Sequence, residues 1–140
     1  MVNRLIFALL GFFLVGSAIA DPNDFRCLKS VGLKKTLRLQ FTFPADSGDV
    51  GSVTYENGSG PISVRRVKEK ELRRVPGGMP SQFEIGWTEI TPDGNGGTYV
   101  FISQGAIIDN FRYMRKDGKV FRFEEDVDAS GDNGCTWAKR

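Results

Sequence analysis

The amino-acid sequence predicts an all-β fold, and three features of the chain carry this prediction. Apolar and polar residues alternate along most of the chain beyond residue 34, which is the period of a strand with one buried face. Segments rich in glycine and proline interrupt the alternation at short intervals, as tight turns do. No long segment repeats its apolar residues with a helical period. About eight short strands connected in this way favour a small antiparallel meander barrel, with a β-sandwich as the alternative.

The chain begins with a segment, residues 1–20, that has the three parts of a secretory signal peptide. Arg4 gives a basic start, residues 5–15 form an apolar run, and Ala18-Ile19-Ala20 matches a small-x-small cleavage site. Residues 21–140 then have the length of one domain, which we expect to be all-β. We therefore expect a secreted or periplasmic protein. No later apolar run reaches the roughly twenty residues of a helical membrane span, so no stable membrane insertion is expected.

Two cysteines, Cys27 and Cys135, lie near the two ends of the expected domain. In an oxidising compartment an even pair predicts one disulfide. Such a bond would close a loop of roughly one hundred residues and, on the chain-entropy model, would stabilise the fold by up to about 4.7 kcal/mol. It also requires the two cysteine-bearing segments to be neighbours, because bonded cysteines have Cα atoms within about 7 Å.

The first strands are predicted where apolar residues occupy every second position. In residues 34–43 these are the leucines and phenylalanines Leu37, Leu39, Phe41 and Phe43. Residues 50–56 and 62–67 flank a glycine-rich loop, and a four-residue loop there would place Tyr55 opposite Ile62. A further strand over 69–75 would end before a proline and two glycines.

The later strands follow the same period, and we expect them over 82–90, 98–103, 106–115 and 119–125. A three-residue loop with Gly118 in the left-handed conformation would join the last two and pair Tyr113 with Phe121. On the outer face of this hairpin Arg112 would then oppose Arg122. We expect Glu124 to relieve the repulsion between these like charges.

The composition restricts the chemistry that the chain can perform. The chain contains no histidine, which removes the commonest general base and metal ligand. Its formal net charge is +2, and part of that comes from Arg4 in the expected signal peptide. A nearly neutral domain does not require a nucleic-acid partner. We expect a protein partner and no nucleic acid, and the sequence leaves the oligomeric state open.

Two surface segments are the expected contact regions. The loop 91–99 contains several glycines together with Asp93, Asn95 and Tyr99, and loops on rigid β scaffolds commonly carry recognition. The second candidate is a basic segment whose arginines are Arg65, Arg66, Arg73 and Arg74. The alternative for this segment is an exposed edge hairpin, where cations suppress strand-to-strand aggregation.

One short segment matches the opening of a calcium-binding loop. Oxygen-bearing residues stand at its first, third, fifth and seventh positions, with Gly131 at the sixth, and they are Asp126, Asp128, Ser130 and Asp132. The twelfth position is Trp137, where an EF-hand-type loop has a bidentate glutamate, and flanking helices are not predicted. The alternative is a solvated acidic turn before Cys135, and no other cofactor is expected.

Two carboxylates, Glu89 and Asp109, share the parity of neighbouring core residues. An inward carboxylate in an apolar pocket can perform acid–base chemistry, and two could form a hydrolase pair. Both stand near expected strand ends, where the inner face opens to water. The aromatic side chains are numerous enough to fill a small barrel, so we expect no roomy internal pocket.

The layout of the chain is similar to that of small periplasmic lysozyme inhibitors of the C-type class. Phe25-Arg26-Cys27 looks like their opening aromatic-x-Cys, residues 95–99 look like their Ser-Gly-x-x-Tyr loop, and residues 104–106 resemble part of their Trp-x-Lys-Gly segment. Asn95 stands in place of the serine, and the tryptophan and lysine are absent. The resemblance implies a β-barrel with a cysteine near each end, whose loops enter the cleft of an enzyme.

We therefore expect an extracytoplasmic binding protein of an inhibitor, immunity or adaptor type, acting by protein–protein contact and not as an enzyme. The alternatives are a calcium-binding or envelope structural module and a carboxylate-dependent hydrolase.

Overall fold

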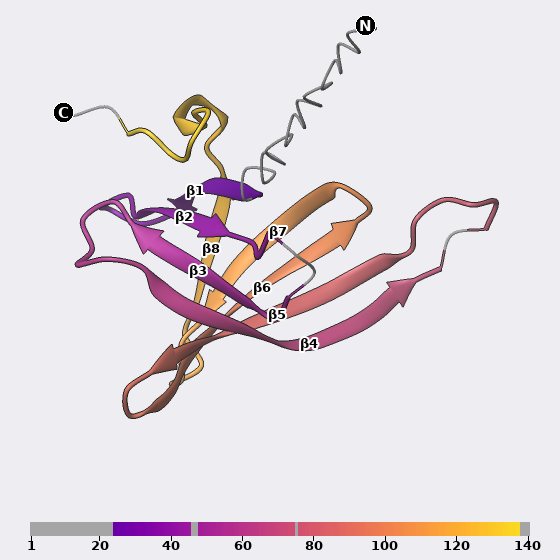
Figure 1. Ribbon diagram of the computed structural model, residues 1–140, viewed down its shortest axis with the longest axis horizontal. Coiled ribbons are helices and arrows are strands. Elements are labelled where there is room, and N and C mark those ends of the chain that lie inside the picture. The colour runs from indigo at the N-terminus through magenta and orange to yellow at the C-terminus, as the bar shows by residue number, and fades with distance from the viewer. Residues whose placement is uncertain (1–23, 46–47, 75, 138–140) are drawn as a thin grey trace, which may run out of the picture.

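The protein is a closed barrel of eight antiparallel strands in meander order, as the sequence predicts (Figure 1). The computed structural model describes residues 24–45, 48–74 and 76–137, so the expected signal peptide lies outside the described residues. Each strand pairs with the next, and β1 pairs with β8 to close the barrel. The strands are β1 (Phe25–Val31), β2 (Arg38–Thr42), β3 (Val50–Tyr55), β4 (Ile62–Arg73), β5 (Gln82–Thr91), β6 (Gly94–Gln104), β7 (Ile107–Met114) and β8 (Val120–Glu125).

The strand count agrees with the prediction, but two elements differ from it. Strand β1 was not predicted, because Cys27 and Leu28 are adjacent and both buried, which breaks the alternation. The expected strands over 62–67 and 69–75 are one strand, β4. A bulge between the pairs Arg66↔Trp87 and Lys68↔Gly86 lets β4 continue through the change of parity.

One of the two predicted hairpin registers is confirmed. Tyr113 pairs with Phe121, and Gly118 has a φ of 89°, as the three-residue loop requires. The other register is wrong, because Ile62 pairs with Val53 and not with Tyr55. The partner of Ile62 on β3 is therefore two residues earlier in the chain than expected. A shift of two residues leaves each side chain on its predicted face, so the core is unchanged.

Large side chains from all eight strands fill the barrel. The buried cluster consists of Leu28, Leu39, Phe41, Val53, Val64, Trp87, Tyr99, Phe101, Phe111 and Phe123. Phe41 lies at its centre, with its ring centroid 5.7 Å from that of Trp87 and 5.6 Å from that of Phe101, both in edge-to-face geometry. The interior is therefore a packed core, as the number of aromatic residues indicated.

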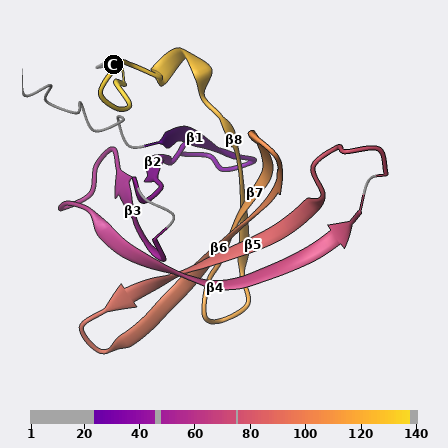
Figure 2. The same ribbon diagram turned by 45° about the vertical axis from the view of Figure 1, so that its right-hand side comes forward.

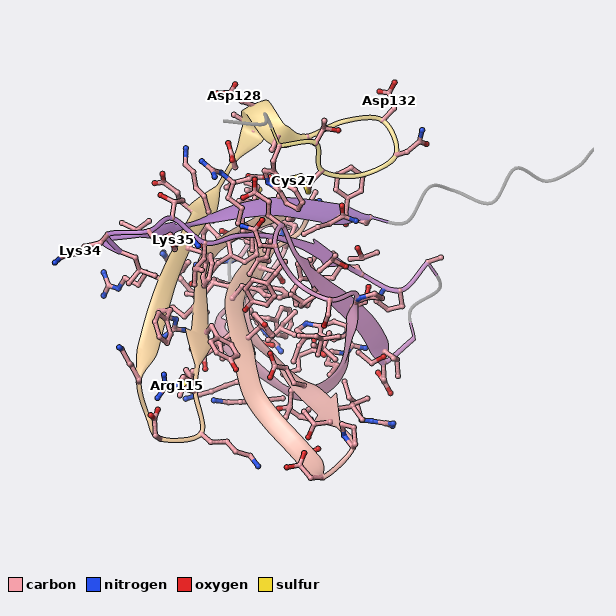
Figure 3. The ribbon with its side chains drawn as sticks, turned by 90° about the vertical axis from the view of Figure 1, so that its left-hand side faces the viewer. Cys27, Lys34, Lys35, Arg115, Asp128 and Asp132 are labelled. Carbon is pink, nitrogen blue, oxygen red and sulfur yellow. A yellow bond between two sulfur atoms is a disulfide. The ribbon has the colours of Figure 1, made fainter. Side chains whose placement is uncertain are left out.

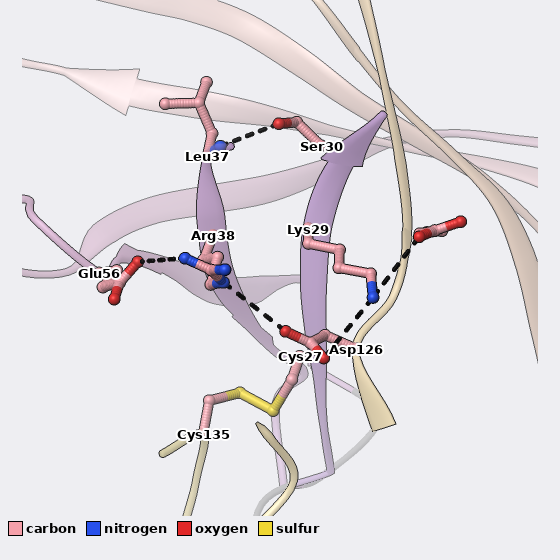
Figure 4. Close-up of polar contacts among 9 residues, drawn as sticks. Cys27, Lys29, Ser30, Leu37, Arg38, Glu56, Asp126 and Cys135 are labelled. Atoms are coloured by element: carbon pink, nitrogen blue, oxygen red, sulfur yellow. Dashed lines mark hydrogen bonds and ion pairs between the residues drawn. A yellow bond between two sulfur atoms is a disulfide. The ribbon is translucent and has the colours of Figure 1, made fainter. Parts of the chain in front are cut away.

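A disulfide joins Cys27 of β1 to Cys135 in the segment that follows β8, with the two Cα atoms 5.7 Å apart (Figure 4). The side chain of Gln40 accepts a 2.8 Å hydrogen bond from the Cys135 amide, which ties the same segment to β2. The predicted bond is thus confirmed, and such bonds are typical of oxidising, non-cytoplasmic compartments. A single short 3₁₀ helix, Val127–Ala129, is the helical structure within the described ranges, and none there could span a membrane.

Candidate functional site

Strand β4 extends well beyond its neighbour β3. Their last pair joins Val50 to Arg65, and from Val67 onward β4 pairs only with β5 in the described part of the chain. Residues 67–74 and 76–84, here called the β4–β5 arm, therefore form a hairpin whose β4 edge is unpaired among the described residues and whose tip projects beyond the last pair, Arg73↔Gln82. Figures 1 and 2 show this hairpin extending away from β1, β2 and β3 in both views.

The β4–β5 arm carries exposed apolar side chains. Val67 is 57% exposed, Leu72 is 41% exposed and Met79, at the tip, is 60% exposed. The arm is held to the sheet along β5, because Gln82 and Phe83 pair with Gln104 and Ser103 of β6. Three large apolar side chains exposed on one hairpin make the arm a candidate interaction surface.

The arginines predicted as a binding patch divide into two groups. Arg66 contacts Asp49 (3.4 Å) and Glu69 (3.7 Å) and lies over the ring of Trp87, and Arg74 pairs with Glu71 (3.1 Å). Arg65 and Arg73 form no ion pair with any described residue, and Lys70 shares this property. The cations on β4 that remain available to a partner are thus Arg65, Lys70 and Arg73.

The second predicted contact region is the β5–β6 turn, and its three predicted contact residues differ in exposure. Asp93 and Asn95 are exposed, and the Thr91 hydroxyl donates to Asp93 Oδ1 (2.8 Å), which lowers the pKa of that carboxyl. Tyr99 is only 4% exposed and points into the barrel, so its expected place in the contact surface is wrong. The turn and the arm lie at opposite ends of β5, about 30 Å apart for ten residues.

Glu89 is the centre of a buried polar cluster that pattern reasoning only partly anticipated. Its carboxylate accepts hydrogen bonds from the hydroxyls of Tyr99 (2.8 Å) and Tyr113 (3.2 Å) and from the amide of Gly97 (3.3 Å). The Tyr55 hydroxyl joins the cluster through Tyr99, with the two oxygens 2.8 Å apart. Strand parity predicts that all four side chains point inward, but not that their polar ends meet.

The cluster holds its tyrosines in the neutral form. Burial, followed by the nearby Glu89 charge, raises the pKa of Tyr113 to about 12. The pKa of Tyr99 is raised further, mainly by burial, and burial also raises the pKa of Tyr55. The three tyrosine hydroxyls therefore stay protonated at neutral pH, and together with the Glu89 carboxylate they form a hydrogen-bond network.

Two glycines make room for this network. A bulge in β6 places Gly96 and Gly97 opposite the single residue Glu89. A Cβ atom on Gly97 would lie 2.5 Å from the Tyr113 ring, and one on Gly96 would lie 2.4 Å from a carboxylate oxygen of Glu89. The glycines expected to form a recognition loop therefore serve, at these two positions, the close approach of Glu89 and Tyr113.

The predicted partner of Glu89 lies elsewhere. A bulge in β7 around Asn110, whose φ is 53°, reverses the parity of the strand. Ile108 consequently packs against the core, while Asp109 is exposed. Glu89 and Asp109 therefore do not form the carboxylate pair that a hydrolase of this type needs.

The residues of the calcium-loop pattern do not surround a common point. Asp126 contacts Lys29 (4.0 Å) and Arg38 (3.8 Å), which neutralise it on the outside of the barrel (Figure 4). Figure 3 shows Asp128 and Asp132 apart on the terminal segment, with side chains directed away from the barrel. Ser130 forms a bridge with Cys135, and within the described ranges no three acidic, histidine or cysteine side chains are grouped to hold a metal ion.

The carboxylate that offsets the repulsion between Arg112 and Arg122 on the last hairpin is not the predicted one. Arg112 does pair with Arg122, but its guanidinium contacts Glu84 of β5 (3.1 Å) and not Glu124, which pairs with Lys29. Hydrogen bonds from Lys68 and Arg112 lower the pKa of Glu84. This carboxylate therefore links the base of the arm to the neighbouring strands.

Comparison with protein-family models, with curated proteins and with solved structures finds no match to this chain.

Proposed function

We propose that the protein is an exported binding protein of an inhibitor, immunity or adaptor type, which acts by contact with another protein through the β4–β5 arm. One observation carries the proposal. Lys70 and Arg73, which form no ion pair with a described residue, stand on the same projecting hairpin as exposed Leu72 and Met79. A surface that combines both properties fits an acidic partner surface that also offers an apolar patch.

The rest of the structure supports binding over catalysis. The buried Glu89 is committed to three hydrogen-bond donors, and Asp109 is on the outside of the barrel. A closed, packed barrel with a disulfide is a rigid base for a projecting element, which reduces the entropy that binding must overcome. Residues 1–20 would direct export, and the disulfide suits the oxidising compartment reached in that way.

Capture from the source cell's own exported fraction tests this proposal. The exported protein is immobilised, and bound proteins are compared for wild type, the charge reversal Lys70→Glu/Arg73→Glu and the apolar change Leu72→Ser/Met79→Ser. The matched control is Lys34→Glu/Lys116→Glu, the same charge reversal at two exposed lysines outside the arm. All variants change exposed residues, so equal melting temperatures confirm that each is folded.

We expect one captured protein to be lost or weakened at least tenfold in both arm variants, retained in the control and released by raised salt. A captured protein that binds the arm variants as strongly as wild type would overturn the assignment of this surface.

A further inference from the structure

A pocket of about 370 Å³ opens at the mouth of the barrel, between the start of β2 and the connection from β3 to β4. It lies at the beginning of β4, whereas the arm lies at the end of that strand. The volume is within the range of about 300–1,000 Å³ found for small-ligand sites, and barrel mouths are common positions for them. The prediction of no roomy pocket holds for the packed interior but not for this mouth.

The inner wall of the pocket is apolar. It is formed by Leu37, which precedes β2, by Tyr55 at the end of β3 and by Ile62 at the start of β4. Leu37 is 37% exposed, although an apolar residue at this position gains from being covered. A hydrocarbon group seated here would remove this side chain and the Tyr55 ring from water.

The charges around the pocket leave one cation free. Arg38 and Glu56 both line it, but they contact each other (3.3 Å), and Arg38 also contacts Asp126 (3.8 Å), as Figure 4 shows. Lys35 also lines the pocket, is exposed and forms no ion pair with any residue the structure describes. The rim thus offers an ammonium group to a ligand, with no free carboxylate to oppose it.

The hydroxyl of Tyr55 cannot supply a donor to a ligand. Glu89 is an acceptor, so the Tyr99 hydroxyl donates its single proton to it. Tyr55 must therefore donate its own proton to the Tyr99 oxygen, 2.8 Å away. Tyr55 contributes only a fixed apolar ring and a spare acceptor, which leaves Lys35 as the charged donor that would fix a ligand's polar end.

From this arrangement we infer that the barrel mouth binds a small amphipathic carboxylate. Its hydrocarbon part lies against Leu37, Tyr55 and Ile62, and its carboxylate lies at the Lys35 ammonium. The inference goes beyond the proposed protein contact and uses a different part of the molecule. No bond is made or broken, so the ligand is held chemically unchanged.

Calorimetric titration with three eight-carbon probes, each below its micelle concentration, tests the inference. Octanoate, octan-1-ol and octylammonium have the same chain and differ in the charge of the head group. We expect octanoate to bind with one site per chain and at least tenfold more tightly than octan-1-ol, with octylammonium weakest. No saturable octanoate binding, or equal affinity for the three probes, would overturn the inference.

Two substitutions locate the site. Lys35→Gln should abolish the preference for octanoate over octan-1-ol, while Lys34→Gln, at the adjacent residue that does not line the pocket, should leave it unchanged. Figure 3 shows both lysines at this end of the barrel, with Lys34 pointing away from it. Leu37→Trp at the exposed rim fills the pocket without disturbing the core, and it should weaken the binding of octanoate and of octan-1-ol by the same factor. Binding that survives both Lys35→Gln and Leu37→Trp would place any ligand site elsewhere.

Discussion

Replacing Glu89 by alanine is the most direct test of the buried polar cluster. The substitution removes the acceptor of three hydrogen bonds, which takes this partner from the buried Gly97 amide and leaves the Tyr99 hydroxyl with Tyr55 alone. A hydrogen bond to a charged group contributes about 1.5–3 kcal/mol, and an unsatisfied buried donor costs about 1–3 kcal/mol. The alanine variant also escapes the cost of burying the carboxylate. We therefore expect the free energy of unfolding to fall by about 2–4 kcal/mol.

Guanidinium chloride unfolding with the disulfide intact, followed by circular dichroism, measures this loss. Glu56→Ala is the matched control, because its carboxylate also contacts a neighbouring side chain (Arg38, 3.3 Å) but does so at the barrel mouth, where the Glu56 side chain is 24% exposed. An ion pair of that kind contributes up to about 1 kcal/mol. Glu89→Gln should give an intermediate loss, since its amide turns a donor toward the Gly97 amide or the tyrosines. Equal unfolding free energies for Glu89→Ala and Glu56→Ala would refute the described network.

Three further predictions concern other parts of the fold. Replacing both Cys27 and Cys135 by alanine should lower the free energy of unfolding by up to about 4.7 kcal/mol relative to the disulfide-bonded wild type, as measured by denaturant titration. The reduced wild type is the control, and the variant should match its stability. Gly97→Ala should destabilise by at least about 1 kcal/mol in the same assay, because its Cβ would lie 2.5 Å from Tyr113, whereas Gly58→Ala, with its nearest contact at 3.2 Å, should cost less. The cluster should also weaken at alkaline pH: the pKa of Tyr113 is about 12 in the fold and 10.0 when unperturbed, so its contribution is complete below pH 10 and is lost as the pH rises from 10 to 12. Absorbance at 295 nm that shows tyrosinate near pH 10 before the fold unfolds would contradict this.

Alternation along single strands predicted much of the fold. The period of two in β2, β5, β7 and β8 gave the class of fold, and the spacing around Gly118 gave the register of the last hairpin. Compartment chemistry predicted the disulfide correctly. These properties are local, or follow from a pair of residues whose chemistry leaves few alternatives.

Bulges account for much of what the sequence did not predict. One extra residue near Asn110 turned Asp109 outward, and another at Gly96 and Gly97 shaped the space around Glu89. A bulge changes which face a side chain occupies without changing the composition of the strand, so alternation alone does not locate it. An exposed edge hairpin was the alternative for the basic segment, but its start was not predicted: exposure of the β4 edge from Val67 onward depends on where the neighbouring strand β3 begins.

The pairing of β1 with β8 has a consequence for how the molecule is made. The seam of the barrel joins the earliest strand to the latest, so the ring of strands stays open until the last part of the chain is available. Contacts between such distant segments form slowly, because a long loop must close before they add stability. Closure of the barrel therefore comes after β8 and the segment that carries Cys135 have been made.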